Sequence, residues 1–109
     1  MKEGLYKVQF HTELGAGFGV VYAKAGKLHG GDSGIYYIGS YSGGGDDITA
    51  SVAIDRHSNH PSTPTSVFGM DKANIILRGK ITGDVVETVG TAKEAPGVQF
   101  QATLIFIGD

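Results

Sequence analysis

Hydrophobic and polar residues alternate along most of this chain, in short runs separated by glycine-rich turns. Tyr6, Val8 and Phe10 alternate with polar neighbours in the first run, and Ile48–Arg56 gives the cleanest pattern. A period of two is typical of an antiparallel strand with one buried face. The pattern predicts strands at Gly4–His11, Gly17–Lys24, Lys27–Gly31, Gly34–Ser42, Ile48–Arg56, Ala73–Ile81, Val85–Thr91 and Val98–Ile107.

The spacing of these runs favours a sheet that closes on itself. Most connections are short, as hairpins between successive strands require. Glycines inside the runs, such as Gly19 and Gly39, allow the bends that a small barrel needs. We therefore predict an all-β fold, a single antiparallel up-and-down barrel of about eight strands that forms one domain over residues 1–109. The long polar connection His57–Lys72 is predicted to form a lid or a short helical turn over one mouth.

The face predicted to point inward carries many aromatic side chains. In the second run, Phe18, Val20 and Tyr22 are predicted to share the inward face. A barrel of about eight strands is just wide enough to be filled by side chains or to hold one small ligand. If the interior is hollow, we expect Tyr22, Tyr37 and Phe100 to line the cavity.

Several strands also have apolar residues on the opposite, outward face. Tyr36, Ile38, Ile105 and Ile107 are the main examples. Apolar residues outside a barrel indicate a self-association patch, and a two-fold dimer is its commonest form. We predict a homodimer through these residues. The alternative is that they are scattered surface hydrophobics of the ordinary kind.

Composition and charge exclude several classes of protein. The net charge of −2 provides no basic surface for nucleic acid. The absence of cysteine excludes thiol redox chemistry, thiolate zinc sites and a disulfide scaffold. No signal peptide and no transmembrane stretch is recognisable, so we expect a cytoplasmic protein that does not bind membranes. We expect no cofactor.

The sequence also contains little that indicates catalysis. Gly15–Gly19 is glycine-rich like a phosphate-binding loop, but a strand rather than a helix is predicted to follow it. Asp55, His57 and His60 offer metal-ligand chemistry, but residues three apart on a strand or loop do not share a face. We therefore predict that the chain is not an enzyme. A metal-assisted enzyme around the two histidines is the weakest alternative.

Short motifs in a shared order span nearly the whole chain. One set comprises Lys2–Tyr6, Gly30–Asp32, Tyr36–Tyr41 and Asp46–Ile48, and a second set comprises Asp55–Ser58, Ser66–Gly69 and Pro96–Phe100. The first set resembles the GrlR-like negative regulators of type III secretion, and the second resembles the shorter, mostly uncharacterised bacterial proteins grouped with them, to which this chain is most similar. The resemblance implies a dimeric, lipocalin-like barrel that represses secretion genes by binding a transcriptional activator, without binding DNA itself.

The resemblance also implies a site for that protein partner. The founding regulator has four consecutive acidic residues after its fourth strand, and the matching positions here are Gly44, Gly45, Asp46 and Asp47. Asp46 and Asp47 are thus the predicted protein-binding residues. Halving the charge of an exposed cluster weakens electrostatic steering of a basic partner. Alternatively, this segment is only a hairpin turn, for which glycine and aspartate are favoured.

Two main functions follow. The first is regulation by surface binding to another protein, and the second is carriage or sensing of a small apolar ligand in the barrel interior. A hollow interior favours the second function, and a filled core favours the first.

Overall fold

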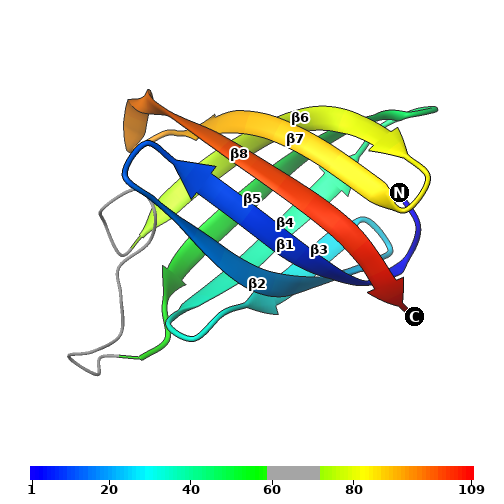
Figure 1. Ribbon diagram of the computed structural model, residues 1–109, viewed down its shortest axis with the longest axis horizontal. Helices are drawn as coiled ribbons and strands as arrows, with labels where there is room; N and C mark the ends of the chain where they lie inside the picture. Colours follow the sequence, from blue (N-terminus) through cyan, green and yellow to red (C-terminus); the bar gives the residue numbers. More distant parts are fainter. Residues whose placement is uncertain (59–71) are drawn as a thin grey trace.

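The computed structural model describes residues 1–58 and 72–109, which form a closed barrel of eight antiparallel strands (Figure 1). Each strand pairs with the next along the chain, and β8 pairs with β1 to close the sheet. The strands are β1 Gly4–Thr12, β2 Gly15–Lys24, β3 Lys27–Gly31, β4 Ile35–Ser42, β5 Asp47–Arg56, β6 Ala73–Thr82, β7 Val85–Ala92 and β8 Ala95–Gly108. This confirms the predicted fold class, an up-and-down barrel of the lipocalin-like kind.

The strand boundaries lie close to the predicted ones. The largest difference is in β8, which begins at Ala95 rather than at Val98. Pro96 and Gly97 give no strand signal in the sequence, but the tight turn after β7 brings Ala95 opposite Ala92. The sheet pairing therefore continues beyond the point where the hydrophobic pattern ends. The predicted lid at His57–Lys72 lies mostly outside the described residues.

The apolar core lies inside the barrel and consists of residues from alternate positions along the strands. Inward residues of neighbouring strands lie opposite each other, as in the pairs Tyr6 with Val21 and Val8 with Leu104. Burial confirms the alternation noted in the first and fifth runs, since Tyr6, Val8, Ile48, Ala50 and Ile54 are all buried. The buried apolar residues are Tyr6, Val8, Val21, Ala23, Leu28, Ile35, Ile48, Ala50, Ile54, Ala73, Ile75, Leu77, Val86, Ala92, Phe100, Ala102 and Leu104.

The predicted orientation of β2 is wrong. Phe18, Val20 and Tyr22 point outward, and Val21 and Ala23 are the buried residues of this strand. A shift of one residue moves every side chain of a strand to the other face. The sequence pattern was misleading because β2 has its larger apolar residues at the outward positions.

Two glycines, Gly17 and Gly19, occupy successive inward positions in the half of β2 that follows the β1–β2 turn. Gly17 lies opposite Phe10 in the pairing with β1, and a Cβ at Gly17 would lie 2.7 Å from Cε2 of Phe10. A Cβ at Gly19 would collide with the hydroxyl oxygen of Tyr37. The glycines therefore provide room for aromatic rings from β1 and β4. These inward positions carry no hydrophobic signal in the sequence, although they face the core.

The two ends of the barrel differ, and each is named here for later use. The closed end has the turns β2–β3, β4–β5 and β6–β7 together with both chain termini (Figure 1). There Tyr6 packs edge-on against Phe106, and Met1 packs against the core. The open end has the turns β1–β2, β3–β4 and β7–β8. Within the described ranges, no helix is long and apolar enough to cross a membrane.

Candidate ligand-binding cavity

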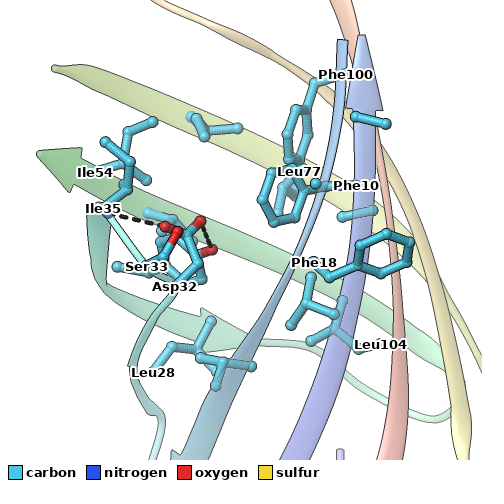
Figure 2. A pocket seen from close by; sticks show the side chains of 18 residues that line it. Phe10, Phe18, Leu28, Asp32, Ser33, Ile35, Ile54, Leu77, Phe100 and Leu104 are labelled. Carbon is cyan, nitrogen blue, oxygen red and sulfur yellow. Dashed lines mark hydrogen bonds between the residues drawn. The ribbon is translucent and has the colours of Figure 1, made fainter. Parts of the chain in front are cut away.

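A cavity of about 230 Å³ occupies the half of the barrel nearer the open end (Figure 2). Its walls come from inward residues of most strands, and two exposed residues, Ser33 and Phe18, also belong to its lining. The described lining residues are Val8, Phe10, Ala16, Gly17, Phe18, Val21, Leu28, Asp32, Ser33, Ile35, Tyr37, Val52, Ile54, Ile75, Leu77, Phe100, Ala102 and Leu104. Nearly all are apolar, so the cavity suits an apolar molecule.

Three aromatic rings stand on the walls of this cavity. Phe10 is stacked against Phe100 with ring centroids 6.1 Å apart and planes at 25°. Phe10 also meets Tyr37 edge-on, at 6.1 Å and 88°. Tyr37 and Phe100 thus line the cavity as predicted. Tyr22 does not, because it lies on the outward face of β2 with 41% of its surface exposed.

The only charged side chain among the described lining residues is Asp32, in the turn between β3 and β4. Its Oδ1 accepts hydrogen bonds from the backbone N–H groups of Gly34 at 3.0 Å and Ile35 at 2.9 Å. Its Oδ2 accepts a hydrogen bond from the hydroxyl of Tyr37 at 2.5 Å. The Asp32 backbone N–H donates to the carbonyl of Ile35 at 2.8 Å, which closes the turn. These bonds hold the carboxylate in one place at the cavity wall.

The hydrogen bond between Tyr37 and Asp32 ties a polar group of the wall to this turn. Burial raises the pKa of Tyr37 strongly, and the hydrogen bond to the Asp32 carboxylate raises it further. The phenol therefore stays protonated and continues to donate to Asp32. Figure 2 shows Asp32 and Ser33 on one side of the cavity, with Phe10 and Phe100 on the other.

The histidine proposed as a metal ligand has a structural role in this turn. The Nε2 of His57 lies 2.9 Å from the carbonyl oxygen of Asp32, and its backbone N–H donates to the carbonyl of Gly34 at 2.9 Å. Because a carbonyl can only accept, Nε2 is the donor. His60, the other predicted ligand, lies outside the described residues. In the ranges 1–58 and 72–109, no group of three or more histidine, aspartate or glutamate side chains could hold a metal ion.

Asp46 and Asp47, the predicted protein-binding residues, lie at the closed end, away from the cavity. Both are exposed in and beside the β4–β5 turn. Asp47 forms an ion pair with Lys80 of the neighbouring strand β6. The ion pair with Asp47 raises the pKa of Lys80, and Asp46 adds a smaller contribution of the same sign. Lys80 therefore offsets part of the acidic charge that this turn presents.

The four residues predicted to form a dimer interface do not make one patch. Tyr36 and Ile38 point outward from β4, whereas Ile105 and Ile107 belong to β8. β4 pairs with β3 and β5, and β8 pairs with β1 and β7, so the two pairs of residues lie on opposite walls of the barrel. A contiguous patch through all four is excluded.

The structure brings a different group of outward apolar residues together. The pairing of β2, β3 and β4 places Tyr22 and Ile38 on either side of His29, and Val20 and Tyr36 on either side of Gly31. With Phe18, these residues form an apolar outer face, called here the β2–β4 face: Phe18, Val20, Tyr22, Tyr36 and Ile38. Only Tyr36 and Ile38 of this group were predicted to lie outward.

Sequence reasoning missed Asp32 as a site residue. The available signal was an aspartate in a glycine-rich turn, Gly30–Gly34, with a tyrosine soon after it. Asp side chains often bond to backbone N–H groups a few residues ahead in such turns, and Asp32 bonds to those two and three residues ahead.

Neither a scan against models of protein families nor a search of curated proteins found a match to this chain.

Proposed function

We propose that this chain is a non-enzymatic binding protein whose barrel interior takes up a small apolar ligand. The proposal is supported by one observation above all, the apolar cavity of about 230 Å³ at the open end. An engineered apolar cavity of roughly 150 Å³ in another protein stays dry and binds benzene. A cavity of this size and lining therefore has room for a ligand somewhat larger than benzene.

The size of the cavity limits both the ligand and its affinity. At the ~30 Å³ that one water occupies in the liquid, the cavity corresponds to about eight non-hydrogen atoms. Burying about seven carbon groups at ~0.8 kcal/mol each gives roughly 5–6 kcal/mol, or a Kd of ~0.1 mM for a purely apolar ligand. This figure is the baseline against which a polar contact would add affinity.

Toluene tests the proposal because it has a suitable size and no hydrogen-bonding group. We expect toluene, titrated into ¹⁵N-labelled protein, to shift amide signals of cavity residues such as Val8, Leu77 and Leu104. Ala102→Leu, which places a larger side chain into the cavity, should weaken toluene binding at least tenfold. Gln99→Leu, on the outward face of the same strand, is the matched control and should bind like wild type. Toluene shifts confined to outward residues, or an unchanged affinity in Ala102→Leu, would contradict the proposal.

A second candidate function is regulation by protein binding, and the β2–β4 face supports it. In this proposal the chain acts in the cytoplasm as a homodimer that holds a transcriptional activator of type III secretion, as the resemblance implies, and binds neither nucleic acid nor membrane. The fractional exposures of Phe18, Ile38 and Val20 are 73%, 51% and 44%. A contiguous group of exposed apolar side chains is typical of a protein–protein interaction surface.

The dimer is the part of this second proposal that the chain itself can test. Ile38→Lys places a charge in the β2–β4 face and should shift sedimentation toward monomer, because burying an unpaired charge is costly. Ile107→Lys is the control, since Ile107 is similarly exposed on β8, and it should remain dimeric. A wild-type monomer at tens of micromolar, about tenfold above the micromolar Kd of a stable dimer, would exclude the dimer.

The regulatory role needs a separate measurement in the host. Deleting the gene should raise the transcripts of secretion genes if the chain represses them. The Asp46→Asn and Asp47→Asn double variant should act like the deletion if these acids hold the activator. Unchanged transcripts in the deletion strain would contradict the second proposal and leave the first one standing.

A further inference from the structure

We propose that the ligand of the cavity is a small apolar amine, whose protonated nitrogen binds the Asp32 carboxylate while its hydrocarbon part fills the barrel. This inference rests on the proposed ligand-binding function and adds the chemical class of the ligand. The geometry that carries it is a fixed carboxylate on the wall of an otherwise apolar cavity.

The hydrogen bonds of Asp32 leave room for one more donor. A carboxylate has roughly four acceptor positions. The backbone N–H groups of Gly34 and Ile35 both donate to Oδ1, and the Tyr37 hydroxyl donates to Oδ2. One position on Oδ2 therefore remains among the bonds of the described residues. This oxygen is the one bonded to Tyr37, and both residues line the cavity.

The other polar groups of the lining point to the same chemistry. The Tyr37 hydroxyl donates its proton to Asp32, so towards a ligand it can only accept. No lysine, arginine or histidine is among the described residues that line the cavity. The polar side of the cavity therefore presents one negative charge, the Tyr37 oxygen as an acceptor, and the Ser33 hydroxyl, which can donate or accept. A ligand carboxylate there would meet a like charge, whereas an ammonium would form a charge-assisted hydrogen bond.

The charged groups around the open end do not reverse this preference. Arg56 lies opposite Ile35 in the β4–β5 pairing, on the inward side of the barrel rim, but it does not line the cavity. His57 uses Nε2 on the Asp32 carbonyl. Asp55 points outward, opposite Tyr36. Among the residues that the structure describes, Asp32 is thus the charged group that an occupant of the cavity would meet.

Three probes of matched length separate charge from hydrophobicity: n-heptylamine, n-heptanol and sodium heptanoate. Each has eight or nine non-hydrogen atoms, close to the number, about eight, that the cavity volume corresponds to at ~30 Å³ per atom. At neutral pH and moderate salt, we expect the amine to bind about tenfold more tightly than the alcohol, because a charge-assisted hydrogen bond is about twice as strong as a neutral one. Heptanoate should bind most weakly. Affinities come from amide shifts in ¹⁵N-labelled protein.

Asp32→Asn tests the role of the carboxylate directly. The amide oxygen of asparagine can still accept from the turn N–H groups, so the turn is preserved. We expect amine affinity to fall about tenfold and the difference between amine and heptanoate to fall below threefold. Asp55→Asn removes a charge at the same end without touching the cavity, and it should bind all three probes like wild type.

Toluene separates failure of this inference from failure of the proposed function. Asp32→Asn that still binds toluene has an intact cavity, so its amine affinity can be interpreted. If toluene binds but wild type prefers heptanoate or heptanol to heptylamine, the inference of an amine ligand is wrong, whereas the proposed binding of an apolar ligand is retained. If no probe shifts the cavity residues of wild type, the ligand-binding function itself is wrong. An equal loss of amine binding in Asp55→Asn would replace the direct contact by a general charge effect and overturn the inference.

Discussion

The two ends of the barrel are built from similar side chains, yet one is filled and the other is hollow. At the closed end, the rings of Tyr6 and Phe106 lie 5.3 Å apart at 76°, and Nζ of Lys2 lies 4.3 Å from the Phe106 ring centroid. The Tyr6 hydroxyl donates to the Lys2 carbonyl at 2.6 Å. The N-terminal residues therefore cover this end of the core.

At the open end, the aromatic rings line the wall and leave space between them. Phe10 lies 6.1 Å from both Tyr37 and Phe100, and glycines rather than side chains stand opposite on β2. The hydroxyl of Tyr37 bonds to a turn instead of to a covering segment. The comparison teaches that aromatic content alone does not decide whether a small barrel is filled. What decides it is whether other groups occupy the space beside the rings.

The largest expected effect is at the closed end. Tyr6 is only 2% exposed, so Tyr6→Ala should lower the free energy of unfolding by about 3–5 kcal/mol through lost burial and the resulting cavity. Tyr22→Ala, which removes the same side chain from the outward face, should cost about 1 kcal/mol or less. Urea unfolding checks both. Equal losses in the two variants would mean that β2 faces the other way.

The next effect tests the space beside the rings at the open end. Gly17→Ala would place a methyl group against the Phe10 ring, and overpacking of this kind costs about 1–3 kcal/mol. Gly97→Ala is the control, because nothing lies within 4 Å of a Cβ at that position. Thermal or urea unfolding of both variants provides the measurement. A Gly17→Ala variant as stable as the control would show that the Phe10 ring can move into the cavity at little cost.

A moderate effect is expected from the hydroxyl groups at the two ends. Tyr37→Phe should cost about 1–2 kcal/mol, towards the lower end for a hydrogen bond to a charged group, because Asp32 is only partly buried. Tyr6→Phe should cost about 0.5–1.5 kcal/mol, since its acceptor is a neutral carbonyl. Urea unfolding at neutral pH measures the difference. A larger loss in the free energy of unfolding for Tyr6→Phe than for Tyr37→Phe would show that the bond between Tyr37 and Asp32 is not the stronger of the two.

The same two tyrosines predict how stability depends on alkaline pH. Burial is the main cause that raises the pKa of Tyr6 and of Tyr37 in the folded chain. Because an unfolded tyrosine ionises near pH 10, the unfolded state loses protons first, and stability should fall as the pH rises above about 10. Tyr37→Phe should show a shallower fall in urea unfolding between about pH 9 and pH 11. An identical slope in this variant and in wild type would contradict the raised pKa of Tyr37.

The smallest expected effect concerns stability at acidic pH and involves a carboxyl group at the surface of the open end. The backbone and side-chain N–H groups of Asn74 donate to Glu94, each at 2.7 Å, and they lower the pKa of the Glu94 carboxyl. A lowered folded-state pKa means that this stabilisation is present above the unfolded value of about 4.5 and is lost as the pH falls through the folded value. Glu94→Gln should therefore flatten the acid limb of stability slightly. An unchanged limb would show that these bonds do not persist in solution.

Sequence alone determined the strand pattern of this protein. The alternation in β5 and in β8 identified both the strands and their inward faces, because most inward positions there are occupied by an apolar side chain such as Ile48 or Phe100. Short turns between successive strands then left an up-and-down barrel as the simplest closure. Local pattern is sufficient where burial and hydrophobicity coincide along one strand.

The tertiary structure decided the features on which the candidate site depends. Gly17 and Gly19 face inward although they carry no side chain, because rings from β1 and β4 occupy the space that their own side chains would need. Asp32 is held in the wall of the cavity by its hydrogen bonds to Tyr37 and to its own turn. The residues of the predicted dimer interface lie on two separate surfaces because β4 and β8 lie across the barrel from each other. Each of these features depends on residues far apart in sequence, so no pattern within one strand could reveal it.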